Sequence, residues 1–141
     1  MRDTPAGAVF SLGDLFEVWV GDDAALEPGF ANDCAAVLKA AAALRPVFFM
    51  HGNRDFLVGD GLMQSCGVTL LDDPTVLGFA GQRWLLTHGD ALCLDDEPYV
   101  RFREQVRAPA WQRPAGVCPG RGRSAAGRSG SRGGWGRQRS P

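Results

Sequence analysis

The sequence of 141 residues lacks several features that would place the protein within a membrane or outside the cell. No apolar run approaches the ~20 residues that a transmembrane helix needs. The first residues also lack the charged-then-apolar order of a secretory signal peptide. The four cysteines, Cys34, Cys66, Cys93 and Cys118, form no CxxC pair and no spacing typical of a disulfide framework. We therefore expect small buried or incidental thiols in a reducing compartment, the cytosol.

Acidic residues are absent from the end of the chain. Residues 1–104 contain all 16 acidic residues and 7 basic ones, a formal charge of −9, whereas residues 105–141 contain 8 arginines and no acid. From residue 113 onward Pro, Gly, Arg and Ser dominate, so this segment cannot bury enough apolar surface to offset its chain entropy. We expect one domain over residues 1–112 and a disordered tail over 113–141. The tail's composition also resembles a frameshift product of GC-rich coding sequence.

Strand and helix signals alternate between residues 8 and 107. Apolar segments predict strands at 8–12, 47–51, 68–71, 76–79 and 83–88, and the last two form a hairpin. Helices are expected at 35–44, after Asn32 or Asp33 as the N-cap, at 59–66 and at 99–107. This alternation predicts an α/β fold with a largely central sheet.

Three of these strands are each followed at once by a side chain that can bind a hard metal ion. Asp14 follows the first strand, Asn53 the second, and His88 the last. In open α/β sheets, ligands bind beyond the carboxyl ends of the strands. Taken singly, Asp14 could cap a helix, Asn53 could form a turn and His88 could be a satisfied strand-end residue. Taken together, they predict a metal site.

The chemistry of these groups favours phosphoryl substrates. A carboxylate, an amide oxygen and an imidazole without thiolate suit Mn²⁺, Mg²⁺ or Fe²⁺ better than structural zinc. The Asp14 carboxylate could bridge two cations, and two ions ~3.5–4 Å apart can activate water and clamp the oxygens of an in-line displacement at phosphorus. Arg54 adds a planar guanidinium that suits a phosphate oxyanion. The alternative for Arg54 is a surface ion pair with Asp55.

Other polar residues allow more than one interpretation. Asp95 and Asp96 could solvate a loop, or one of them could accept hydrogen bonds from a substrate hydroxyl or a nucleobase. For Asp22 and Asp23 we expect loop solvation. His51 is expected to be structural rather than a metal ligand.

The three loops form ordered motifs that resemble those of the calcineurin-like metallophosphoesterases. The motifs are Gly13-Asp14, Gly52-Asn53-Arg54-Asp55 and His88-Gly89-Asp90. The longer segments 12–23, 52–59 and 88–93, with Asp95, Asp96 and Tyr99, resemble the bacterial UDP-2,3-diacylglucosamine diphosphatases of lipid A biosynthesis. This resemblance runs from about residue 8 to residue 112. Most metallophosphoesterases carry His where Arg54 stands, which favours the diphosphatases.

The resemblance implies a partial αββα sandwich and hydrolysis of UDP-2,3-diacylglucosamine to UMP and 2,3-diacylglucosamine 1-phosphate with a pair of Mn²⁺ ions. It implies Asp14 as the bridging ligand and Asn53 and His88 as ligands of the second metal. Asn53, Arg54 and Asp96 are implied substrate contacts. The expected partners are the UDP-linked acylated glucosamine and the cytoplasmic face of the inner membrane, to which a monomer binds peripherally, without nucleic acid.

Parts of the diphosphatase pattern do not occur in this sequence. The resemblance implies an Asp-x-His motif well before Asp14 and a Gly-His-x-His motif after Gln112, and the only histidines are His51 and His88. We therefore expect a fragment, truncated at both ends and inactive, with three metal ligands left. Two alternatives stay open. One is a phosphoesterase for another nucleotide or phosphoester, and the other is nucleic-acid binding through the Arg/Gly tail.

Overall fold

Three parallel strands form the central sheet of the computed structural model, which describes residues 5–112. Strand β1 (Val9–Leu12) pairs with β2 (Val47–Met50), and β2 pairs with β3 (Val68–Leu71), so β2 is central. Helix α1 (Phe30–Ala42) connects β1 to β2, and α2 (Asp60–Ser65) connects β2 to β3. Parallel neighbours need such crossovers. The predicted α/β fold is confirmed.

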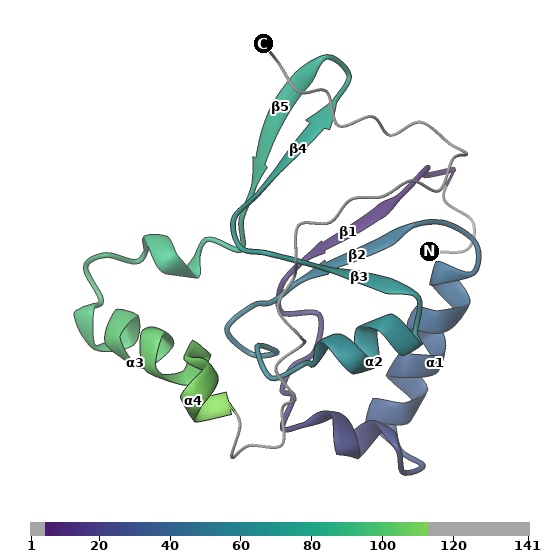
Figure 1. Ribbon diagram of the computed structural model, residues 1–141, viewed down its shortest axis with the longest axis horizontal. Helices are drawn as coiled ribbons and strands as arrows, with labels where there is room; N and C mark the ends of the chain where they lie inside the picture. The colour runs from purple at the N-terminus through teal and green to yellow at the C-terminus, as the bar shows by residue number, and fades with distance from the viewer. Residues whose placement is uncertain (1–4, 113–141) are drawn as a thin grey trace.

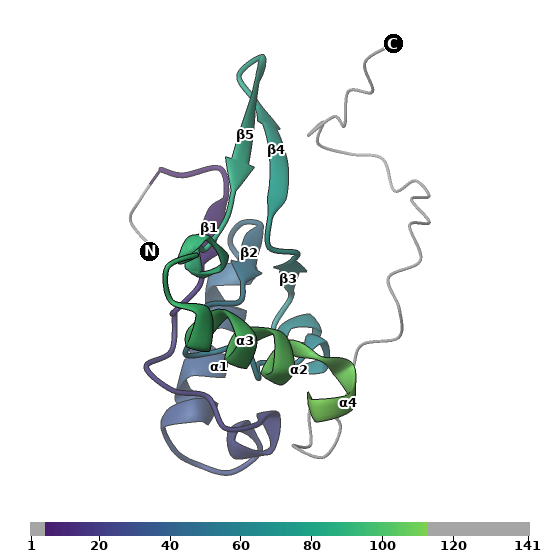
Figure 2. The same cartoon turned by 90° about the vertical axis from the view of Figure 1, so that its left-hand side faces the viewer.

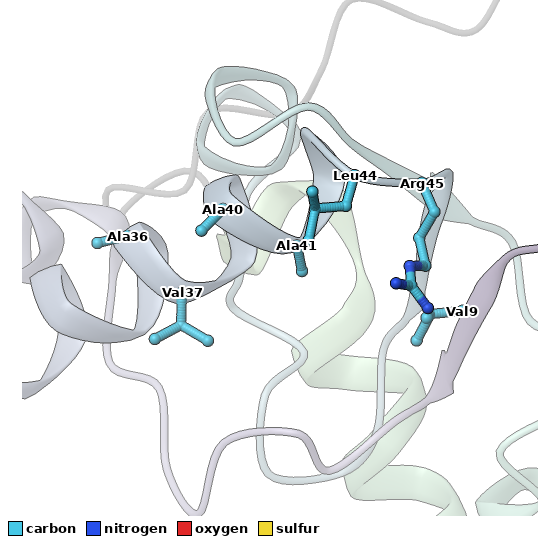
Figure 3. A pocket seen from close by; sticks show the side chains of 7 residues that line it. All are labelled: Val9, Ala36, Val37, Ala40, Ala41, Leu44 and Arg45. Atoms are coloured by element: carbon cyan, nitrogen blue, oxygen red, sulfur yellow. The ribbon is translucent and has the colours of Figure 1, made fainter. Parts of the chain in front are cut away.

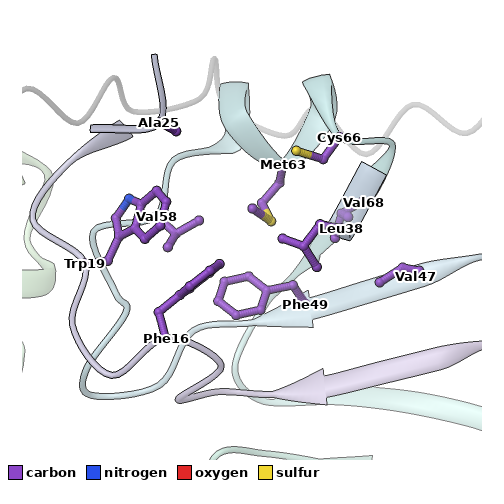
Figure 4. Packing of buried hydrophobic residues seen from close by; sticks show 10 residues of the cluster. All are labelled: Phe16, Trp19, Ala25, Leu38, Val47, Phe49, Val58, Met63, Cys66 and Val68. Atoms are coloured by element: carbon purple, nitrogen blue, oxygen red, sulfur yellow. The ribbon is translucent and has the colours of Figure 1, made fainter. Parts of the chain in front are cut away.

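The hydrophobic core lies between one face of this sheet and helices α1 and α2 (Figures 1 and 4). Phe49 of the central strand is fully buried there. The loop after β1 contributes Phe16 and Trp19, whose rings lie 4.5 Å apart between centroids. The loop that carries Asp14 is therefore anchored in the core. The buried cluster comprises Phe16, Trp19, Ala25, Leu38, Val47, Phe49, Val58, Met63, Cys66 and Val68.

Two further strands form a separate antiparallel hairpin, β4 (Thr75–Phe79) and β5 (Gln82–Leu86). Figures 1 and 2 show that it extends away from the helices. Its two turn residues, Ala80 and Gly81, have φ of 53° and 73°, the left-handed conformation that a two-residue hairpin loop requires. The predicted hairpin is thus confirmed, and His88 lies just past its second strand.

Helix α3 (Glu97–Arg107) and the short α4 (Pro109–Gln112) complete the described residues. Single 3₁₀ turns, η1 (Asp22–Ala25) and η2 (Asp90–Leu92), lie in the connecting loops. Helix α3 lies beyond the carboxyl ends of the central strands (Figure 1). Its position matters for the site, because the polar loops occupy the same end of the sheet.

The predicted cap of the first helix is wrong. Helix α1 begins at Phe30, so Asn32 and Asp33 lie inside its first turn, and Gly29 occupies the N-cap position without a side-chain hydrogen bond. Instead, the Asn32 amide nitrogen donates to the carbonyl oxygen of Ala25 at 2.9 Å. The side chain is thus used to join α1 to η1 rather than to cap the helix.

The cysteines within residues 5–112 form no disulfide, as expected. Cys66 is buried, Cys34 is half-buried and Cys93 is exposed. Burial, with the negative charge of Asp33, raises the pKa of the Cys34 thiol.

Within the same described region, no helix has the length and apolar character to cross a membrane. Cys118 and the tail expected over 113–141 lie outside the described residues.

A candidate metal and phosphate site

The loops after β1, β2 and β5 bring four of the predicted site residues together. The Nε2 atom of His88 lies 3.1 Å from Asn53 Oδ1 and 3.8 Å from Asp14 Oδ1. The backbone N–H of Arg54 donates to Asp14 Oδ1 at 3.0 Å, and Arg54 Nε lies 3.8 Å from Asp14 Oδ2. A carboxylate, an amide, an imidazole and a guanidinium therefore share one edge of the sheet.

Two glycines permit this close approach of the loops. A Cβ atom on Gly52 would collide with the carboxylate of Asp14, and one on Gly13 would collide with the imidazole of His88. Gly13 and Asp14 both have positive φ, 96° and 53°, so the chain turns sharply at the end of β1. Glycine adopts this conformation without strain, and Asp is among the few other residues that tolerate it.

The tautomer of His88 follows from its first hydrogen bond. Its Nδ1 atom lies 2.8 Å from the carbonyl oxygen of Leu12, which can only accept, so Nδ1 carries the proton and donates. In the neutral ring Nε2 is then left with its lone pair directed toward Asn53 and Asp14. Metal-binding histidines are oriented by the same kind of contact from the other ring nitrogen.

The amide of Asn53 provides a test of whether these groups fit a cation. With its oxygen toward His88 and Asp14, acceptors face acceptors, an arrangement that a bound cation would satisfy. Turned by 180°, the amide nitrogen donates to His88 Nε2 at 3.1 Å and to Asp14 Oδ2 at 3.0 Å. The same side chain therefore satisfies its neighbours with or without an ion. The donor set fits Mn²⁺ or Mg²⁺.

The donor set is nevertheless small. Among the residues that the structure describes, no cluster of three or more His, Cys, Asp or Glu side chains could hold a metal ion. Any site formed by Asp14 and His88 within this region thus depends on the Asn53 amide as the third donor.

Arg54 is accessible and already paired with an anion. Its side chain is 48% exposed and donates to the carboxylate of Glu17, which is 85% exposed. The alternative prediction, an ion pair with Asp55, is wrong because Asp55 is fully buried and bonded to the backbone. A phosphate oxyanion would compete with Glu17 for the guanidinium.

Asp55 is a structural carboxylate that the sequence did not reveal. Its Oδ2 accepts from the backbone N–H groups of Leu15 at 2.8 Å and Phe16 at 3.3 Å, and its Oδ1 accepts from Gly52 at 2.7 Å. These charge-assisted bonds offset the cost of burying the charge. Asp55 therefore joins the loop after β1 to the loop after β2. The sequence signal for this role was its position three residues after Gly52, whose N–H it accepts.

Three of the other ambiguous polar residues, Asp22, His51 and Asp96, have defined partners. Asp22 accepts from Trp19 Nε1 at 3.0 Å and from the Gly59 N–H at 3.0 Å, so the expectation of loop solvation is wrong for it. His51 Nε2 bonds the Val58 carbonyl oxygen at 2.7 Å, a structural contact as expected. Asp96 caps α3 by accepting from the Tyr99 N–H at 3.1 Å, and its substrate contact stays a prediction.

A buried ionic cluster next to the site, formed around Asp90 by residues of α3, was not predicted from the sequence. Asp90 Oδ2 accepts from the Tyr99 hydroxyl at 2.8 Å, from Arg103 Nε at 2.9 Å and from Arg107 Nη2 at 3.1 Å. Arg103 also reaches Asp73 Oδ2 at 3.3 Å. The three donors are spaced four residues apart and therefore share one face of α3, a signal that the sequence contains.

The cluster changes the acidity of its members. Burial raises the pKa of the Asp90 carboxyl, but hydrogen bonds from Arg103 and Tyr99 and the positive charges of Arg107 and Arg103 outweigh it, so that pKa lies below its ordinary value. Burial, and then the hydrogen bond to Asp90, raise the pKa of Tyr99 to about 12. Asp90 is thus ionised and the phenol of Tyr99 is neutral across the physiological range.

A groove at the other end of the strands has a different character (Figure 3). It begins at Val9, the first residue of β1, and follows α1. Its lining is apolar apart from Arg45 and offers no carboxylate or imidazole, so it is not a metal site. The lining residues are Val9, Ala36, Val37, Ala40, Ala41, Leu44 and Arg45.

The fold and the strand-end residues together define the class of the protein. A parallel sheet whose first two strands end in a carboxylate and an amide, with an arginine beside them and an imidazole from the end of the hairpin, is part of an α/β metallophosphoesterase fold.

Comparison with curated proteins finds similarity to proteins named UDP-2,3-diacylglucosamine hydrolase. The protein of that name from Pseudomonas savastanoi pv. phaseolicola is 46% identical over 108 residues, 77% of this chain and 43% of that protein. Those from Chromobacterium violaceum and Xanthomonas campestris pv. campestris are each 52% identical, over 105 and 107 residues. These matches cover 74% of this chain and 44% and 42% of the relatives. No family model matches the chain.

The chain is therefore related in sequence to the UDP-2,3-diacylglucosamine hydrolases, and the resemblance inferred from the motifs is confirmed. It spans less than half of the length of the relatives reported above.

Proposed function

We propose that this chain contains part of an active site that hydrolyses the diphosphate of UDP-2,3-diacylglucosamine, giving UMP and 2,3-diacylglucosamine 1-phosphate. The observation that carries the proposal is the convergence of Asp14, Asn53 and His88 beside Arg54 in a chain about half identical to hydrolases with that substrate in their name. The cofactor proposed for the site is Mn²⁺, in a pair when the ligand set is complete.

Each residue would have a defined task. Asp14, Asn53 and His88 would hold the ion, which when bound supplies a Lewis acid for a phosphate oxygen and lowers the pKa of a water molecule. The Leu12 carbonyl keeps the proton of His88 on Nδ1, so Nε2 remains available. Arg54 binds phosphate oxygens after exchanging its carboxylate partner for the substrate.

We expect the 141-residue chain by itself to be inactive. Three donor groups leave much of the coordination shell of an octahedral ion to water. More than half of the length of the chain's relatives has no counterpart in the match.

Because the proposed substrate carries acyl chains, the proposal also places the protein as a peripheral monomer on the cytoplasmic face of the inner membrane. Asp96 is the proposed additional substrate contact.

The experiment combines metal binding with product analysis. The purified chain and its Asp14→Asn and His88→Gln variants are titrated with Mn²⁺ by electron paramagnetic resonance, and UMP release from UDP-2,3-diacylglucosamine is measured by mass spectrometry. We expect the unaltered chain to bind Mn²⁺ more tightly than either variant, and we expect none of the three proteins to release UMP above background. Equal Mn²⁺ binding by all three proteins would contradict the proposed site.

The same assay separates the alternative substrates. Faster hydrolysis of bis(p-nitrophenyl) phosphate than of UDP-2,3-diacylglucosamine would favour a phosphoesterase for other phosphoesters. Turnover as fast as that of a full-length relative would overturn the expectation of inactivity. The nucleic-acid alternative rests on residues 113–141, which lie outside the described region, and a gel-shift titration with RNA at several salt concentrations tests it.

A further inference from the structure

Arg107 of helix α3 connects two of the loops that carry the proposed metal ligands. Its Nη2 atom donates to the carbonyl oxygen of Gly52 at 3.0 Å and to Asp90 Oδ2 at 3.1 Å. Gly52 directly precedes Asn53, and Asp90 follows His88 by two residues. A single side chain from a distant helix thus spans both loops, and no step of the chemistry assigned above uses it.

The contact with Gly52 determines the direction of one peptide group. The Gly52 N–H is held by Asp55 at 2.7 Å, and its carbonyl oxygen is held by Arg107. Because the peptide unit is planar, fixing that oxygen also fixes the direction of the Asn53 N–H and the position of the Asn53 Cα atom, from which its side chain starts. A glycine would otherwise allow many orientations of this peptide.

Arg107 is itself held in position. Its side chain is 20% exposed, and Asp90, whose side chain is 6% exposed, also accepts from Tyr99 and Arg103 on the same face of α3. The second carboxylate oxygen of Asp90 is buried and has no hydrogen-bond partner among the described residues. An unsatisfied buried oxygen costs stability. The bonds that hold Arg103 and Arg107 to Asp90 all end on its Oδ2 atom.

We propose that Arg107 is a positioning residue for the metal site: through the Gly52 carbonyl it orients Asn53 toward His88 and Asp14. It acts through the backbone and does not contact the ion. This inference rests on the proposed function, because it concerns the same donor groups. It adds a residue from α3 to a site that the motifs placed entirely on the strand-end loops.

The test compares Arg107→Met with a matched change on the same helix. Arg101 is 78% exposed and pairs with Glu97 one turn away, so Arg101→Met removes an arginine without touching the loops. Mn²⁺ affinity is measured by electron paramagnetic resonance. We expect Arg107→Met to weaken Mn²⁺ binding on the order of 10-fold, as for residues that orient a metal ligand, and Arg101→Met to leave it within about twofold. Arg107→Lys retains a donor and should restore part of the loss.

A second readout does not require metal. In the metal-free chain, the backbone and side-chain amide resonances of Asn53 should shift in Arg107→Met and stay in place in Arg101→Met. Arg103→Met keeps the Gly52 contact while weakening the attachment of α3, so it should lower the thermal midpoint but move Asn53 less. If Arg107→Met does not fold, Arg107→Lys and Arg103→Met provide the comparison.

The outcomes are distinguishable. Mn²⁺ binding by folded Arg107→Met within twofold of the unaltered chain would overturn the positioning role, as would an equal loss in Arg101→Met. Failure of the unaltered chain to bind Mn²⁺ would instead refute the proposed function. The Asn53 resonances would then still decide: a shift specific to Arg107→Met supports the orienting contact, and unmoved resonances refute it.

Discussion

Two buried carboxylates at the same end of the sheet, Asp55 and Asp90, are satisfied in opposite ways. Asp55 accepts only from backbone N–H groups of the β1 and β2 loops. Asp90 accepts from a phenol and two guanidinium groups of α3, and one of its oxygens has no partner within residues 5–112. Asp55 is therefore held by the neutral backbone N–H groups of the two loops that it connects. Asp90 instead depends on helix α3 being packed in its place.

The largest effect is expected for Asp55→Ala. The change leaves three N–H groups without their acceptor inside the protein, and each unsatisfied buried group costs about 1–3 kcal/mol, so we expect a loss of about 3 kcal/mol or more in the free energy of unfolding. Urea denaturation followed by tryptophan fluorescence measures it. Asp95→Ala, at an exposed loop position, is the control and should change the stability by less than about 0.5 kcal/mol. Equal losses in the two variants would refute the structural role of Asp55.

A smaller loss, about 2 kcal/mol, is expected for Asp90→Ala. Its removal leaves Arg103 and Arg107 without their common partner, but both side chains are about one-fifth exposed and can reach water. Because the two guanidinium groups are partly exposed, high salt should slightly reduce the difference between Asp90→Ala and the unaltered chain and should leave the difference for Asp55→Ala unchanged. Urea titrations at low and high NaCl concentration measure both. The distinction fails if salt affects the two variants equally.

The ionisation of Tyr99 provides a third comparison, expressed in pH rather than in free energy. Tyr99 is the only tyrosine in the chain, so near-ultraviolet absorbance reports it alone. We expect its pKa at about 12 in the folded protein, against about 10 in urea. Since the folded pKa is raised, the stability from the neutral phenol is fully present below pH ~10 and is lost as the pH rises toward 12. Asp90→Asn removes the negative charge and should lower this pKa, and an unchanged value would contradict the contact.

The smallest effect is expected for Glu17→Gln. Glu17 occupies Arg54 through an exposed ion pair, and such pairs contribute at most about 1 kcal/mol. Removing the competing carboxylate should raise the affinity for inorganic phosphate by about twofold to fivefold, measured by calorimetry in the presence of Mn²⁺. The exposed Glu27→Gln controls for the change in net charge and should have no such effect. Unchanged phosphate affinity in Glu17→Gln would show that Arg54 does not bind the anion.

The fold was largely readable from local patterns. The apolar run at Val47–Met50 and the Ala80–Gly81 turn are short-range signals, and both appear where they were expected. The start of α1 was misplaced, because Asn32 uses its amide to reach Ala25 rather than to cap the helix. A polar side chain such as Asn32 bonds to the partner that lies next to it in space, and the local sequence does not contain that information.

The sequence by itself determined which donor groups stand at the strand ends and to which hydrolases the chain is related, because strand-end position and ordered motifs are properties of the linear chain. Only the tertiary structure decided the partners of the charges. Arg54 faces Glu17 instead of its neighbour Asp55, and Arg107 reaches Gly52 across 55 residues of sequence. The physical reason is that a charged side chain bonds to whichever partner the packing brings within hydrogen-bond distance.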